Sequence, residues 1–164
     1  MAANGLIYTA SFQGVTVTNA IQDIFELIAS TNCSAIVHSW RVEFVPTITS
    51  GVAQDVRLNL QLVRRTTTGS GGVAVVPKPT NPRNTVVALT TVNRTVVTTQ
   101  GTIGDIEYGG NPSVIVPWER GYMPDQRLDL PASGGSAQNR LCLFLAAAPG
   151  QSFVASGEVY IEEV

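Results

Sequence analysis

Residues 54–65 carry the clearest strand pattern in the chain, and this pattern constrains the fold more than any other feature. Apolar side chains occupy every second position, and mostly polar side chains stand between them. A period of two is typical of a strand with one buried face and one exposed face. We therefore expect a core strand over Gln54–Arg65. The buried positions would be Val56, Leu58, Leu60 and Leu62, and the exposed positions Arg57, Asn59, Gln61 and Arg64.

The next segment, Thr66–Asn84, has a different character. It opens with the flexible run Thr-Thr-Thr-Gly-Ser-Gly-Gly and continues with Pro77, Pro79 and Pro82. Proline cannot donate to a strand ladder, so neither a continuous strand nor a helix is expected here. The sequence predicts a long loop over residues 66–84 that proline stiffens into an arm. Long loops on a β scaffold are common places for binding contacts.

Other segments alternate in the same way or are continuously apolar. Residues 20–28 also show helical spacing, but they lie between β-rich runs and we interpret them as a strand. Residues 120–131 are expected to be irregular. In 139–147 both faces are apolar, which predicts a central strand covered on both sides. The expected strands are 6–12, which resumes over 15–18 after a break at Gly14, then 20–28, 35–45, 54–65, 85–92, 95–99, 102–108, 113–118, 139–147 and 153–163.

This spacing of short strands and turns indicates the fold class. The pattern predicts an all-β, antiparallel, jelly-roll-like sandwich of about eight to ten strands, in a single domain over residues 1–164. The last strand, 153–163, is expected to return beside the first. In that strand Val159 and Ile161 would point inward, and Glu158, Tyr160 and Glu162 outward.

The chain has few charges for a protein of this size. Charged residues make up 13% of its 164 residues, against about 25% in typical domains. Low charge is compatible with a surface that meets other proteins, and also with an ordinary β domain coated by Thr and Ser. The net charge of −2 and the single lysine argue against nucleic-acid binding. No apolar run approaches 18 residues and no signal-peptide pattern is present, so no membrane segment is expected.

The sequence contains no pattern that predicts an enzyme, a cofactor or a metal site. His38, the only histidine, alternates with Ile36 and Trp40, which predicts a core histidine. Asp105 and Glu107 share a strand face and are expected to be exposed polar positions, although a carboxylate-only site stays possible. Phosphate-loop, nucleophile-elbow and calcium-loop motifs are absent. The two cysteines, Cys33 and Cys142, are either free thiols, which we favour, or a disulfide.

A group of aromatic and charged residues follows Trp118. Aromatic side chains beside arginine are typical interface anchors. The alternative is that they close one end of the sandwich. With the loop over residues 66–84 they make up our candidate interface, which consists of Arg65, Thr66, Thr67, Val75, Pro77, Lys78, Pro79, Trp118, Arg120, Tyr122 and Met123.

Three stretches together resemble small virion proteins of tailed bacteriophages. They are Leu62–Pro79, Arg140–Glu163 and Gln22–Leu27. The resemblance implies a β-sandwich or jelly-roll accessory, a decoration or cement protein that binds the major capsid protein on the phage head. It further implies a homo-oligomer, with a trimer favoured, that is made in the cytoplasm of the host bacterium. The family offers no catalytic residues to transfer to this chain, and the resemblance supports a strand at Gln22–Leu27.

A second hypothesis is a receptor- or carbohydrate-binding sandwich, such as a fibre head. This function would require an exposed aromatic platform, for which Trp118 and Tyr122 are the candidates. For the first hypothesis the arm over residues 66–84 is the element expected to reach a neighbour. The sequence leaves open whether it would grip a sister subunit or the shell beneath.

Overall fold

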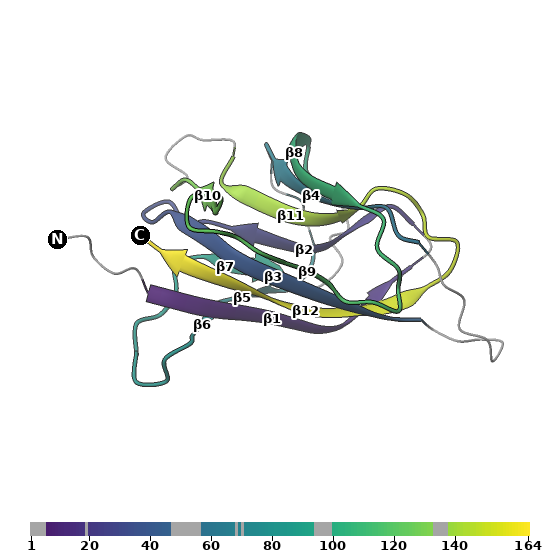
Figure 1. Cartoon of the computed structure of the whole chain (residues 1–164). Helices are drawn as coiled ribbons and strands as arrows, with labels where there is room; N and C mark the ends of the chain where they lie inside the picture. The colour runs from purple at the N-terminus through teal and green to yellow at the C-terminus, as the bar shows by residue number, and fades with distance from the viewer. Residues whose placement is uncertain are drawn as a thin grey trace.

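Two antiparallel β-sheets pack face to face in the computed structural model of the protein (Figure 1). The structure describes residues 6–18, 20–46, 57–67, 69, 71–93, 100–132 and 138–164. These residues form twelve strands and no helix. The expected all-β sandwich is therefore confirmed, with more strands than predicted because four of them have only two or three residues.

The two sheets, which we call sheet A and sheet B, have six strands each. In sheet A the order is β10 (Leu128–Leu130), β3 (Ala35–Pro46), β12 (Phe153–Glu163), β1 (Leu6–Val17) and β6 (Lys78–Pro79), and β9 (Trp118–Gly121) also pairs with β3. In sheet B the order is β5 (Ala74–Val75), β7 (Thr91–Asn93), β2 (Gln22–Ile28), β11 (Arg140–Leu145), β4 (Leu60–Arg65) and β8 (Ile103–Gly110).

The eight longer strands wind as a jelly roll. Strands β1, β3, β9 and β12 belong to sheet A, and β2, β4, β8 and β11 belong to sheet B. Consecutive long strands change sheet at every step except from β4 to β8. The last strand, β12, lies between β1 and β3, so its predicted return beside the first strand is confirmed. This winding is the architecture of jelly-roll sandwiches.

The core lies between the sheets and follows the alternation read from the sequence. Leu58, Leu60 and Leu62 are fully buried, as predicted, although regular pairing of β4 begins only at Leu60. Residues 54–56 of the expected strand lie outside the described residues. On the other face of sheet B, Val63 forms a smaller buried cluster with Cys142 and Phe144. Strand β11 is therefore covered on both faces, as its sequence predicts.

A β-bulge in β3 overturns the prediction for His38. Tyr160 of β12 pairs with Ser39 and the next residue, Ile161, pairs with Val37, so His38 is an extra residue in the ladder. The bulge reverses the alternation, because Val37 before it and Trp40 after it are both buried. His38 does not belong to the core. Its Nε2 atom lies 2.8 Å from Oε2 of Glu162, and its side chain is 19% exposed.

Several expected segments differ from the observed elements. Strand β2 over Gln22–Ile28 is confirmed, and its helical alternative is excluded. Residues 113–117 form a turn instead of the predicted strand, and β9 begins at Trp118. Strands β9 and β10 also place regular structure in the region 120–131, which was expected to be irregular. The strand predicted over 85–92 is reduced to β7, and the strand predicted over 95–99 lies entirely outside the described residues.

Candidate interaction surfaces

The segment predicted as a free loop is held by both sheets. Strand β5 pairs with β7 at the edge of sheet B, and β6 pairs with β1 at the edge of sheet A. Only Val76 and Pro77 separate the two, so here the chain crosses from one sheet to the other. Edge positions tolerate Pro79 in β6 because a proline there costs no ladder bond. Pro77 is buried in the free chain but lines a groove with Val86 and Val87, so its role at an interface stays a prediction.

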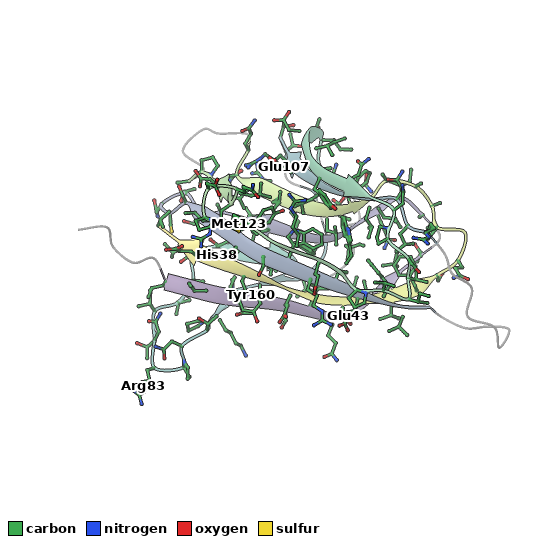
Figure 2. The ribbon with its side chains drawn as sticks, in the orientation of Figure 1. His38, Glu43, Arg83, Glu107, Met123 and Tyr160 are labelled. Carbon is green, nitrogen blue, oxygen red and sulfur yellow. The ribbon has the colours of Figure 1, made fainter. Side chains whose placement is uncertain are left out.

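Beyond β6 the chain projects away from the sandwich, with Arg83 near its tip (Figure 2). Its base is fixed on both sides. The amide of Thr80 donates to the carbonyl of Ile7 at 3.0 Å, and the amides of Leu89 and Thr90 donate to Oε1 of Glu163 at 2.9 and 2.7 Å. The segment is therefore pre-organised, which reduces the conformational entropy lost on docking. From here on, the arm means residues 73–89, in place of the predicted range 66–84.

The surface of the arm is apolar and cationic. Val76, Val86 and Val87 line one shallow groove of about 260 Å³ together with Lys78. Lys78 and Arg83 are exposed, and the arm contains no acidic residue. Of the interface residues predicted here, Lys78 is exposed and Val75 and Pro79 are half-buried. The exposed apolar side chains of the arm are Val73, Val76, Val86, Val87 and Leu89.

Arg65 is not an interface residue, contrary to the prediction. Its side chain is 1% exposed, on the outer face of sheet B. It donates to Oδ1 of Asp23 and, at 2.8 Å, to the carbonyl of Gly101. The guanidinium also lies 4.8 Å from the centre of the Phe144 ring. Burial raises the pKa of the Asp23 carboxyl, although the charge of Arg65 opposes this shift.

Thr66 and Thr67 are exposed, as the interface prediction requires, but both are tied to Thr102. The amide of Thr66 donates to the carbonyl of Thr102 at 2.9 Å. The amide of Thr102 donates to Oγ1 of Thr67 at 2.8 Å. These bonds continue the pairing of β4 with β8, so the two threonines belong to the framework of sheet B.

The aromatic cluster around Trp118 closes part of the sandwich, which confirms the alternative to the interface reading for this residue. Trp118 is 9% exposed. Its ring centre lies 4.4 Å from that of Trp40 and 5.5 Å from that of Tyr108. Nε1 of Trp40 donates to the hydroxyl of Tyr122 at 3.1 Å, and burial raises the pKa of that hydroxyl. These contacts leave no exposed platform at Trp118.

Two predicted residues near this cluster remain accessible. Arg120 is half-buried, and its guanidinium lies 4.5 Å from the centre of the Tyr108 ring and 5.3 Å from that of Tyr122. Met123 is 64% exposed. The interface residues predicted around Trp118 therefore fall into two groups. Trp118 and the greater part of Tyr122 stabilise the fold, whereas Met123 faces solvent.

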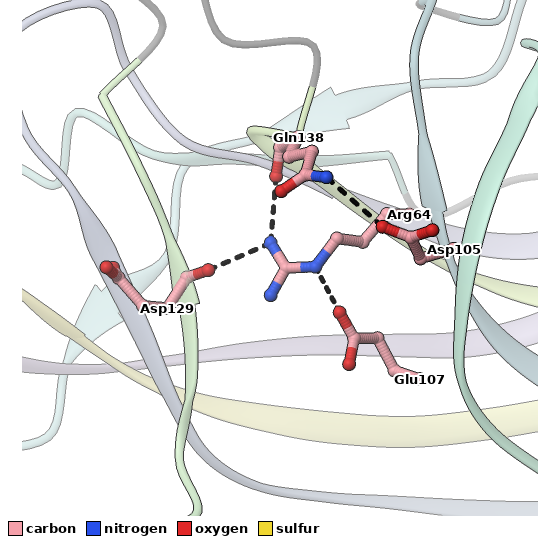
Figure 3. A network of polar contacts seen from close by, with 5 residues as sticks. All are labelled: Arg64, Asp105, Glu107, Asp129 and Gln138. Atoms are coloured by element: carbon pink, nitrogen blue, oxygen red, sulfur yellow. Dashed lines mark hydrogen bonds and ion pairs between the residues drawn. The ribbon is translucent and has the colours of Figure 1, made fainter.

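A second edge surface lies on the side of the sandwich formed by β8 and β10, and sequence reasoning missed it. Arg64 reaches across this side between the sheets (Figure 3). Nη1 of Arg64 donates to the carbonyls of Asp129 at 2.9 Å and Gln138 at 3.0 Å. Its Nε donates to the carboxylate of Glu107. Nε2 of Gln138 donates to Oδ2 of Asp105 at 3.1 Å. Arg64, expected to be exposed, is therefore largely buried.

This side of the molecule, which we call the acidic edge, combines carboxylates with apolar groups. Ile103 and Ile106 of β8 are 43% and 58% exposed. Asp105 and Asp129 are exposed, and Glu107 is half-buried. Their three carboxylates and the one guanidinium of Arg64 leave two negative charges. Among the described residues, no group of three or more His, Cys, Asp or Glu side chains is arranged to hold a metal ion.

A third surface lies where several connections meet at one end of the sandwich. The strand register brings the ends of β1, β8 and β11 and the starts of β4 and β12 to this end. The turn over 113–117 is fixed by a hydrogen bond of 3.3 Å from the amide of Val116 to the carbonyl of Ser113. In the described turns 18, 20–21, 57–59, 111–117 and 146–152, Arg57 is the one charged residue. Exposed apolar side chains of this loop end are Ile21, Ile115 and Val116.

The fold defines the protein as an antiparallel jelly-roll-like sandwich, and the comparisons with known proteins add little to this. No family model matches the chain, and no curated protein matches it. Among solved structures, it is similar to a chain of the structure of infectious bursal disease virus Gx strain. The identity is 19% over 98% of this chain and 40% of that chain, with a TM-score of 0.14. This likeness is too weak to carry an argument. No helix of the described residues could span a membrane.

Proposed function

We propose that the protein is a structural virion protein of a tailed bacteriophage, which decorates or cements the head shell. One observation carries the proposal. Among the described residues, ten of the fifteen exposed large apolar side chains lie on three surfaces, namely the arm, the acidic edge and the loop end. Extended apolar surface on a folded protein is typical of interaction sites. The jelly-roll winding supports the proposal because viral capsid proteins use this architecture, as do lectins. The resemblance of the sequence to phage virion proteins points the same way.

The mechanism would be mechanical. A stable protein–protein interface buries about 1,600 Å², and a homo-oligomer, with a trimer favoured, adds its contacts by avidity. We assign the loop end to the major capsid protein of the phage head, because Arg57 is the one charged residue in its described turns and apolar burial would drive the contact. No catalytic step or cofactor is needed for this function.

Mass spectrometry of purified particles tests the proposal directly. The particles are those of the phage whose genome encodes the chain. The expected result is an abundant component whose copy number follows that of the major capsid protein. Absence of the chain from particles assembled while it is expressed would end the proposal.

A substitution at the loop end tests the assigned surface. Ile115→Asp with Val116→Asp places two charges on it and should lower occupancy of purified capsids by at least roughly tenfold, because each charge would be desolvated without a partner. Met123→Asp is the control, since Met123 is 64% exposed, close to the 63% of Ile115, but belongs to the turn between β9 and β10. Equal loss for both variants would remove the loop end from the proposal.

The carbohydrate-binding alternative shares the jelly-roll winding but lacks the exposed aromatic platform that it needs. It needed Trp118 and Tyr122 as an exposed platform, and Trp118 is buried against Trp40. Deleting residues 66–84 would not separate the two functions, because this segment contains β5 and β6 and connects the sheets. Point substitutions on exposed side chains are therefore the better probes.

A further inference from the structure

The arm and the acidic edge lie on opposite sides of the sandwich. The arm contains β5 and β6, which are the edge strands on one side of the two sheets. The acidic edge is formed by β8 and β10, which end the same sheets on the other side. Figure 2 shows this separation, with Arg83 at the bottom of the molecule and Glu107 at the top. Both surfaces expose branched apolar side chains, and their charges are opposite.

We propose that copies of this chain bind one another head to tail, with the arm of one copy on the acidic edge of the next. Val76, Val86 and Val87 of the arm would pack against Ile103 and Ile106 of the neighbour. Lys78 and Arg83 would face the carboxylates around Arg64 of that neighbour. The arm then grips a sister subunit, which answers the question that the sequence leaves open. The contact rests on the proposed function only for its biological setting.

Charge selects a second copy as the occupant. Lys78 and Arg83 give the arm two positive charges and no negative one, and the acidic edge has two negative charges in excess. The charges of the two surfaces are therefore opposite in sign. A contact between two arms, or between two acidic edges, would bring like charges together and is disfavoured. Nucleic acid is a poorer partner, because two cations neutralise few phosphates.

The geometry of the contact determines the kind of assembly. Because the two complementary surfaces lie on different sides of one molecule, the contact is heterologous. Such contacts give a closed ring when the rotation between neighbours closes, and an open filament when it does not. Apolar burial would supply most of the affinity, and the charges would supply orientation and association rate. Both surfaces are already fixed in the free chain, so little ordering accompanies binding.

Charge-swapped variants of the full chain test the contact by analytical ultracentrifugation over a range of protein and salt concentrations. Lys78→Glu with Arg83→Glu should weaken self-association by at least roughly tenfold. Asp105→Lys with Asp129→Lys should weaken it equally. All four substitutions in one chain restore opposite charges across the contact and should recover association. Arg57→Glu, which reverses an exposed cation at the loop end, should leave association unchanged.

Three outcomes would overturn the contact. The wild-type chain could stay monomeric at all concentrations, Arg57→Glu could act like the arm variant, or the fourfold swap could fail to recover association. If the fourfold variant does not fold, mixing the two double variants replaces it, because each then offers the surface that the other lacks. A chain that associates but is absent from particles defeats the proposed function alone. A monomer that occupies particles defeats this inference alone.

Discussion

Arg64 and Arg65 are neighbours on β4, and they stabilise the sandwich in two different ways. Arg65 points to the outer face of sheet B and forms an ion pair with Asp23 at 1% exposure on both sides. Arg64 points the opposite way and bonds to the carbonyl of Asp129 in β10, a strand of sheet A. Its partner Glu107 is 23% exposed. The first arginine secures one face of a single sheet, and the second joins the two sheets at the acidic edge.

A charged residue on a strand therefore does not identify the exposed face of that strand. Successive side chains point to opposite faces, and both faces of β4 are covered at this end. Each arginine lies in a largely buried site where specific acceptors bind its guanidinium. The two sites differ in those acceptors. Arg65 depends on a carboxylate that has no access to water. Arg64 depends on two backbone carbonyls and on a carboxylate that water can reach.

The largest expected effect is that of Arg65→Ala. It leaves the carboxylate of Asp23 buried without its partner, and breaking a buried pair costs about 3–5 kcal/mol of stability. Urea unfolding measures this as a shift of the midpoint. Arg65→Met combined with Asp23→Leu removes both charges and should be less destabilised than Arg65→Ala. If the double variant were the weaker of the two, the buried charge would not be the cause.

Arg64→Ala should have a smaller effect, about 2 kcal/mol, because water can hydrate Glu107 and only the carbonyls lose their donor. The damage should also be local. Hydrogen exchange of the β10 amides should accelerate in Arg64→Ala. It should accelerate less in Arg64→Lys, because the lysine ammonium can donate to the same acceptors. Faster exchange in β2 instead would show that Arg64 does not act between the sheets.

These two residues also show what the sequence could predict. Alternation identified β4 and its buried leucines, because a period of two is a local property of the chain. It could not tell which outer positions are covered, since the cover comes from Gly101 and from residues on other strands. Alternation failed at His38 for a related reason. A bulge is set by the neighbouring strand, and the pairing of β12 with β3 is not visible in either segment alone.

The candidate site was predicted in part. The loop over residues 66–84 was recognised from its prolines and glycines, and Gly71 and Gly72, which precede the arm, adopt left-handed φ angles of 89° and 79° that favour glycine. Its attachment to both sheets was not predicted, because strands of two residues leave no periodic signal. The acidic edge was missed because Asp105 and Asp129 come from different strands and meet only after folding. Trp118 was predicted at an interface but is buried, because an aromatic residue beside charges is equally suited to a core and to an interface.

The smallest expected effect concerns pH and separates the two arginines once more. Burial raises the pKa of Asp23 above its ordinary value of 3.8 in the folded protein. The folded state then binds a proton at a pH where the unfolded state has released it, so this group adds stability as the pH falls. Its contribution is fully present below the unfolded pKa and is lost as the pH rises through the folded one. Asp23→Asn removes this dependence.

The unfolding free energies of wild type and Asp23→Asn are measured from neutral pH down toward 4. The difference between their slopes against pH is the contribution of Asp23. Wild type should gain stability relative to Asp23→Asn as the pH falls. Arg65→Ala should steepen that gain, because the positive charge that opposes the rise in pKa is lost. Arg64→Ala should leave it unchanged, since Arg64 lies on the opposite face of β4. Equal slopes for the two arginine variants would mean that Arg65 affects the pKa of Asp23 no more than Arg64 does. The ion pair between Arg65 and Asp23 would then not control the pH dependence.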